Sequence, residues 1–112
     1  MRKRTITETL RIGAGAGFQG DRFEPAIILG EQGNLDYLVL ECLAERTIAL
    51  AQKNKLDNPA LGYDPFLQRR LEPLLPLLKK RGIRLITNRG AANPAAAGRA
   101  ILAIARQQGI AI

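Results

Sequence analysis

Histidine is absent from this chain of 112 residues, and cysteine occurs once, at Cys42. A disulfide needs two cysteines, whereas the common zinc sites and the Ser-His-Asp triads need histidine. We therefore expect no metal site and no histidine-dependent hydrolase. Without a histidine partner, Cys42 is either a buried, inert thiol or a nucleophile activated by a helix N-terminus or by Arg46.

Long apolar runs are also absent, since none approaches the ~20 residues that cross a bilayer. The basic start at residues 1–4 leads into polar residues rather than into the apolar core of a signal peptide. We therefore expect a cytoplasmic protein with no membrane partner. The 46% hydrophobic and 24% charged residues are typical of one folded domain, which we place at residues 9–112 after a basic tail at residues 1–8.

Acidic residues are in the minority, with 10 Asp and Glu against 17 Lys and Arg, so the net charge is +7. The bases lie in the tail and around one amphipathic segment that contains Arg69, Arg70, Lys79, Lys80, Arg81 and Arg84. The aromatic residues do not alternate with these bases as they do in a nucleic-acid platform. We interpret the segment as a solvated helix face and expect no nucleic acid. A non-catalytic interaction module that docks this basic face on an acidic partner stays an alternative.

Apolar segments of strand length alternate with helical periodicity, and this alternation is typical of β-α-β units. The expected strands are residues 10–12, 35–42, 83–87 and 110–112, and the expected helices begin near residues 25, 43, 67 and 94. The prediction is an α/β fold with an open, Rossmann-like parallel sheet of about four strands and helices on both faces. Because the fourth strand has three residues, we expect the sheet to be completed by the remainder of a longer protein or by a second copy.

Two prolines interrupt the most amphipathic segment. Its leucines at positions 67, 71, 74, 75 and 78 share one helical face. Pro73 and Pro76 each remove a backbone hydrogen bond at a cost of about 3 kcal/mol. We therefore expect the helix either to kink or to restart near Pro73, and to stop at Gly82.

A glycine-rich segment follows the first expected strand, at the end of the strand where open parallel sheets bind ligands. Gly13, Gly15, Gly17 and Gly20 leave the backbone accessible to a phosphate or carboxylate, and Asp21 follows them. These five residues are candidate ligand-binding residues, and the expected ligand is a small anionic molecule. A purely structural turn is the alternative.

The spacing of the last three glycines also fits the dinucleotide fingerprint, in which an acid at the end of the next strand binds ribose. Glu41 occupies that position. Two features argue against NAD(P): the helix begins only near Pro25, and Asp21 places negative charge where a pyrophosphate would lie. A dinucleotide-dependent oxidoreductase therefore stays an alternative to another anionic ligand.

Glu41 ends the second expected strand, and Glu45 and Arg46 lie at the beginning of the next helix. Glu41 is the candidate catalytic residue, as a general base or as the acceptor for ligand hydroxyls. Glu45 and Arg46 are candidate ligand-binding residues, because a guanidinium grips carboxylates and phosphates. The alternative is that Glu45 complements the helix dipole and that Arg46 pairs with a neighbouring acid.

The third candidate loop follows the expected strand at residues 83–87. Asn88, Gly90 and Asn93 form an amide-rich turn that suits a polar ligand. The alternative is that Asn93 only caps a helix whose first residue is Pro94.

Three segments together resemble the acyclic terpene utilisation family of AtuA-like proteins. They are residues 11–22 (RIGAGAGFQGDR), 35–47 (LDYLVLECLAERT) and 87–94 (TNRGAANP). The resemblance extends over nearly the whole chain from Leu10. Members of the family are considerably longer, so it implies the N-terminal portion of an α/β domain. Two residues depart from the family pattern: Pro73 is an added proline, and Arg89 lies where a smaller or apolar residue is expected.

The family is associated with the bacterial breakdown of citronellol- and geraniol-type compounds. The intermediates of this breakdown are branched acyl-CoA thioesters, which are processed beside a biotin-dependent carboxylase. The resemblance therefore implies part of a catabolic protein that binds an acyl-CoA-type ligand, without defining a reaction. The residues themselves require no cofactor.

Overall fold

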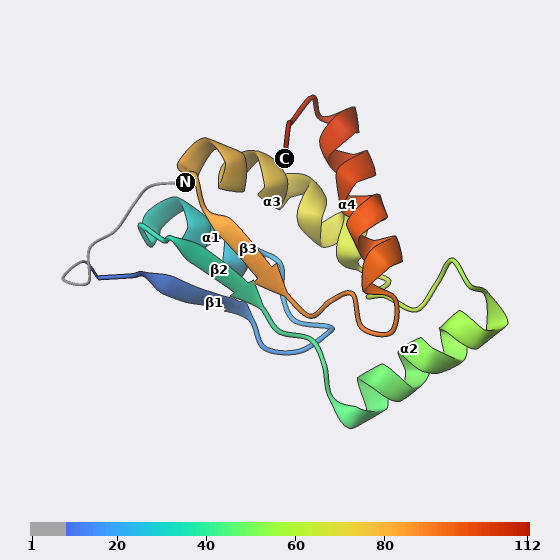
Figure 1. Cartoon of the computed structure of the whole chain (residues 1–112). Helices are drawn as coiled ribbons and strands as arrows, with labels where there is room; N and C mark the ends of the chain where they lie inside the picture. Colours follow the sequence, from blue (N-terminus) through green and yellow to red (C-terminus); the bar gives the residue numbers. More distant parts are fainter. Residues whose placement is uncertain (1–8) are drawn as a thin grey trace.

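Three parallel strands form the sheet in the order in which they occur along the chain, β1 (Ile12–Ala16), β2 (Tyr37–Leu40) and β3 (Arg84–Thr87) (Figure 1). The computed structural model describes residues 9–112, so the tail expected at residues 1–8 lies outside the described residues. Both strand pairs are parallel, and a bulge interrupts β1 near its end. The predicted open parallel α/β sheet is therefore confirmed.

Helices cover one face of this sheet. Leu38 and Leu40 of β2 are completely buried, whereas Ile12 and Ile86, which point to the other face, are 63% and 53% exposed. A right-handed crossover places its helix on a fixed side of the sheet, and both crossovers here step in the same direction, so their helices share a face. Within residues 9–112, the second layer of helices that we expected is not formed.

The helices are α1 (Glu24–Gln32), α2 (Glu45–Asp57), α3 (Leu67–Arg81) and α4 (Pro94–Gln107). Helices α1 and α3 lie side by side behind the sheet, and α4 packs against α3 (Figure 1). In contrast, α2 projects away from the sheet, and Ala51 is its only buried residue. The core is therefore built from β1, β2, α1, α3 and α4.

Helix α3 is continuous through both prolines, so it does not restart near Pro73. Pro76 has no N–H for the Glu72 carbonyl four residues earlier, and the Gln108 side chain donates to that oxygen over 2.6 Å instead. Gly82 ends the helix in the left-handed conformation, with φ of 66°. The predicted stop is thus confirmed, and a side chain from beyond α4 replaces one lost backbone bond.

The strand expected at residues 110–112 is not formed. The N–H of Ile110 donates to the Ala105 carbonyl over 2.8 Å, which closes the end of α4, and Ile112 is exposed.

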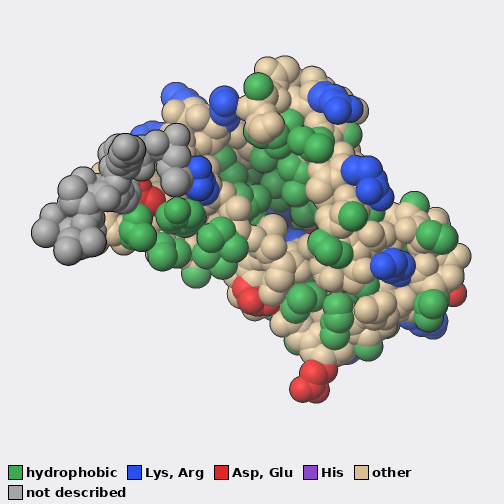
Figure 2. Space-filling view, in the orientation of Figure 1, with side chains coloured by type: hydrophobic (Ala, Val, Ile, Leu, Met, Phe, Trp, Pro, Cys, Tyr) green, Lys and Arg blue, Asp and Glu red, His purple; other side chains and the backbone are tan. Residues whose placement is uncertain are grey.

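Figure 2 shows hydrophobic side chains gathered in a hollow between the sheet and α4. None of the helices in residues 9–112 combines the length and the apolar character that crossing a membrane requires.

Candidate functional site

The carboxyl ends of the three strands meet at one edge of the sheet. The N–H of Glu41, after β2, donates to the Ala16 carbonyl at the end of β1 over 3.1 Å. The Asn88 side chain, after β3, donates to Glu41 Oε1 over 2.6 Å. We call this edge the strand-end rim and define it as residues 16–22, 41–46 and 87–93. The rim brings together segments that are far apart in the sequence.

Arg89 lies at the centre of the strand-end rim and is completely buried. Its guanidinium donates to the carbonyls of Phe18 (3.0 Å), Gln19 (3.2 Å) and Glu41 (3.2 Å), and to Asp64 Oδ2 (2.5 Å). One side chain thus joins the turns that follow β1 and β2 to the loop before α3. The sequence identified Arg89 only as a departure from a family pattern, so this role was missed.

Arg70 forms a second buried contact with the same turn. It is 2% exposed and donates to the carbonyls of Asp21 (2.6 Å), Arg22 (3.1 Å) and Gln19 (3.4 Å). Its guanidinium also lies 4.4 Å from the centre of the Phe23 ring, and burial lowers its pKa. Our assignment of Arg70 to a solvated basic face is therefore wrong, because the turn after β1 covers it.

Of these two guanidinium groups, only that of Arg89 pairs with a buried carboxylate, that of Asp64, whereas Arg70 bonds to backbone carbonyls. Asp64 also accepts the N–H of Phe66 over 3.0 Å, so it is fixed from two sides. The Nε atoms of Arg70 and Arg89 are buried without a hydrogen-bond partner among the described residues. The buried side chains beneath the turn at residues 17–22 therefore carry more positive than negative charge. The inward-pointing carbonyls of the turn are the other acceptors for the two guanidinium groups.

Gly13 and Gly15 lie inside β1 rather than in a loop. A Cβ at Gly13 would lie 2.7 Å from side-chain atoms of Leu29 and Leu35, and one at Gly15 would lie 2.8 Å from Ala26 Cβ. Such distances are shorter than van der Waals contact. Close packing against α1 and its following loop therefore explains both glycines without a ligand.

Gly17 and Gly20 lie in the turn after β1, and packing does not explain them. A Cβ at Gly17 would meet only Asp21 Oδ2, and one at Gly20 only the Phe18 ring, each at 3.9 Å. Neither glycine has a positive φ. Neither the backbone nor the neighbouring side chains thus require glycine here, and the space above the turn is open.

Asp21 closes this turn with its side chain. Its Oδ2 accepts the N–H of Gly17 over 2.8 Å, and its Oδ1 accepts the N–H of Arg22 over 2.9 Å. These two bonds hold the pKa of the Asp21 carboxyl below its usual range, and the charges of Arg70 and Arg89 lower it further. Asp21 is therefore an ionised carboxylate bound to backbone amides.

Glu41 is exposed, and one of its two carboxylate oxygens is fully engaged. Oε1 accepts the Asn88 side chain and the N–H groups of Cys42 (2.9 Å) and Leu43 (2.7 Å). The bond from Asn88, followed by that from Leu43, lowers the pKa of the Glu41 carboxyl. Glu41 is thus ionised near neutral pH, and its Oε2 is the oxygen that a ligand can reach.

Cys42 and Asn88 complete this part of the strand-end rim. The N–H of Cys42 also donates to Asn88 Oδ1 over 2.8 Å, so both polar ends of the Asn88 amide are occupied. The Cys42 thiol is buried and free, and burial raises its pKa. Of our two alternatives for Cys42, this environment favours the inert thiol.

The remaining candidate residues divide into buried and exposed ones. Asn93 donates to the carbonyls of Pro59 (3.0 Å) and Leu61 (2.9 Å), and it accepts the N–H of Ala96 (3.4 Å) as the cap of α4. The predicted cap is therefore confirmed, and its amide is already used.

Gly90 also has a packing explanation, because a Cβ there would lie 2.7 Å from Pro94 Cα. Glu45 and Arg46 are exposed in the first turn of α2, and neither forms an ion pair with another described residue. Arg46 is therefore available to a ligand.

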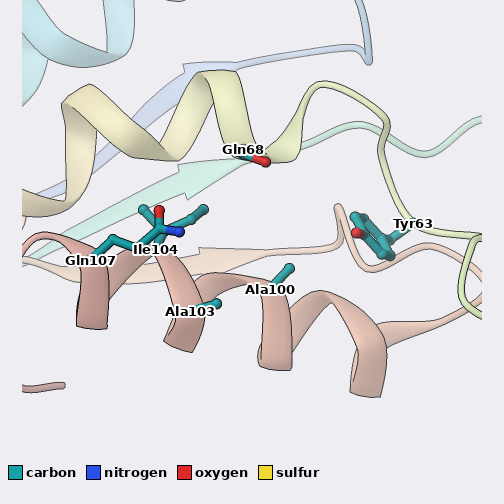
Figure 3. A pocket seen from close by; sticks show the side chains of 6 residues that line it. All are labelled: Tyr63, Gln68, Ala100, Ala103, Ile104 and Gln107. Carbon is teal, nitrogen blue, oxygen red and sulfur yellow. The ribbon is translucent and has the colours of Figure 1, made fainter.

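A separate cleft of about 210 Å³ lies between α3 and α4 (Figure 3). It is lined by Tyr63, Gln68, Ala100, Ala103, Ile104 and Gln107, none of which is a candidate site residue. Across the described part of the chain, no three acidic, cysteine or histidine side chains cluster in a way that suits a metal ion.

The parallel sheet and the loops at its carboxyl edge define a Rossmann-like α/β domain. The model of the acyclic terpene utilisation family protein AtuA matches residues 10–112. The chain therefore belongs to that family. No curated protein and no solved structure matches it.

Proposed function

We propose that this AtuA-like protein of acyclic terpene utilisation binds an anionic organic ligand of the acyl-CoA type at the strand-end rim. The observation that carries the proposal is the open space above Gly17 and Gly20. Neither close packing nor a positive φ requires glycine at these two positions. The buried guanidinium groups of Arg70 and Arg89 beneath the same turn favour negative charge above it.

Each part of the strand-end rim has a different role in this proposal. The backbone amides of the turn at residues 17–22 hold a phosphate or carboxylate, and the exposed Arg46 adds a counter-charge. Glu41 Oε2 accepts a hydroxyl or N–H of the ligand. Glu41 is also the candidate proton acceptor, although its lowered pKa makes it a weak base and favours the hydrogen-bonding role.

Titration calorimetry with geranyl-CoA and with free CoA tests this function. We expect the wild type to bind both compounds. The Arg46→Ala variant should bind each of them at least about tenfold more weakly, which corresponds to ~1.4 kcal/mol. Arg81→Ala is the matched control, because it removes an equal, exposed charge at the far end of α3. Equal affinities for the wild type and Arg46→Ala would remove the role of Arg46, and no binding of either compound would contradict the proposal.

One observation favours a dinucleotide as the second candidate ligand. Glu41 follows β2, the middle strand of the sheet, and its Oε2 is exposed. In Rossmann-like domains, the acid that binds the ribose hydroxyls has a similar position. Fluorescence titration with NADH distinguishes the candidates. Enhancement of NADH emission that Glu41→Ala abolishes would favour the dinucleotide over the acyl-CoA ligand.

A further inference from the structure

The side chain of Asp21 binds the turn after β1 as an external anion would. Its two oxygens accept N–H groups from opposite ends of the turn, Gly17 at 2.8 Å and Arg22 at 2.9 Å. A carboxylate or a phosphate of a ligand makes the same pair of contacts with backbone amides. The anion that the turn can hold is thus already supplied by the chain itself.

The backbone of the turn is also held by contacts that do not involve this carboxylate. The Asp21 carbonyl accepts Arg70 over 2.6 Å, and the carbonyls of Phe18 and Gln19 accept Arg89. Because both guanidinium groups are buried, they hold the turn from below while the Asp21 side chain lies above it. The carboxylate can therefore rotate away from the amides without loss of the contacts that position them.

Two further features fit an anionic group of a ligand at this turn, namely access from above and positive charge below. The open space at Gly17 reaches the atoms that Asp21 binds, since the nearest neighbour of a Cβ at Gly17 is Asp21 Oδ2. Below the turn, Arg70 and Arg89 are at least 98% buried, and the Nε of each has no hydrogen-bond partner within residues 9–112. Two guanidinium groups and one carboxylate, that of Asp64, thus lie below the turn, and the carboxylate of Asp21 supplies the second negative charge from above.

We propose that Asp21 is an internal competitor that occupies the subsite for the anionic group of the ligand, and that ligand binding displaces its carboxylate from the amides of Gly17 and Arg22. This inference rests on the proposed function and specifies one contact within it. The subsite takes a carboxylate or a phosphate, and ligand and Asp21 carboxylate exclude each other. Removal of the carboxylate must then strengthen binding rather than weaken it.

Calorimetric titration of CoA and of inorganic phosphate into four proteins tests the proposal. The proteins are the wild type, Asp21→Ala, Asp21→Asn and Glu24→Ala. Glu24 is the matched control, because it is an exposed acid close to the same turn and bonds to none of its amides. We expect Asp21→Ala to bind CoA at least tenfold more tightly than the wild type, and Glu24→Ala to change the affinity less than threefold.

The outcomes separate this inference from the function on which it rests. Binding of CoA with equal or weaker affinity by Asp21→Ala would overturn the competitor and leave the proposed function intact. Absence of CoA and phosphate binding in all four proteins would overturn both. Asp21→Asn keeps the size of the side chain and removes its charge, so tighter binding by this variant supports the competitor even where Asp21→Ala fails to fold.

Discussion

Gly13 and Gly15, in the first half of the glycine-rich segment, are enclosed by neighbouring side chains, whereas Gly17 and Gly20, in the second half, face open space. In the sequence these four residues belong to one pattern. In the structure the first pair lets a helix approach a strand closely, and the second pair leaves a turn accessible from outside. A glycine pattern alone therefore does not identify a ligand loop, because the neighbouring elements determine whether a glycine is required for close packing or leaves the backbone accessible.

The charges of the strand-end rim divide in the same way. Arg70, Arg89 and Asp64 lie beneath the turns, where they join backbone segments. Asp21, which is half-buried, and Glu41, which is exposed, lie on the outer side, where their carboxylates accept backbone amides. The buried charges therefore hold the shape of the rim, and the outer ones are those that we propose to face a ligand.

Removal of the central buried charge has the largest expected effect on this division. We expect Arg89→Met to lower the free energy of unfolding by about 3–5 kcal/mol, because it leaves the buried Asp64 without its partner. Urea denaturation followed by circular dichroism measures this change. Arg81→Met, at an exposed site on α3, should cost at most about 0.5 kcal/mol. Equal costs for both variants would show that Arg89 does not hold the rim together.

A pair of glycine substitutions tests the difference between the two halves of the segment. We expect Gly15→Ala to cost about 1–3 kcal/mol, since its methyl group would overlap Ala26. Gly17→Ala should change the free energy of unfolding by less than about 0.5 kcal/mol. The same denaturation experiment reports both values. A costly Gly17→Ala would mean that the fold requires this glycine after all.

The exposed carboxylate of Glu41 has the smallest expected effect, and it depends on pH. Because hydrogen bonds lower the pKa of Glu41 in the folded state, its contribution is present above the pKa of the unfolded chain. That contribution is lost as the pH falls through the folded-state pKa. Glu41→Gln should therefore be less stable than the wild type at pH 7, and the difference should vanish in acid. A difference that is constant between pH 7 and pH 3 would contradict this account.

Local signals predicted the ends of several helices correctly. Helix α1 begins at Glu24, directly before Pro25, and α3 ends at Gly82. The cap at Asn93 is confirmed as well. These ends could be predicted because a proline or a cap acts through its own backbone and that of its immediate neighbours.

The buried centre of the rim could not be predicted as easily, because its partners are far apart in the sequence. One signal was present for Arg70, which lies three residues after Leu67 and four before Leu74, on the buried leucine face of α3. Asp64 and Arg89 gave no such signal. Their pairing depends on how the loop before α3 meets the turn after β3, and no local pattern contains that information.

The sequence by itself determined the class of fold, the family, the helix stops and the meeting of three strand ends at one edge, since hydrophobic periodicity and parallel pairing specify these features. Only the tertiary structure decided which glycines are packed and which are open, that Arg70 and Arg89 lie inside, and that the Asp21 carboxylate covers the amides of the turn. The reason is physical: burial and charge pairing depend on distances between segments, and these distances exist only after the elements have packed together.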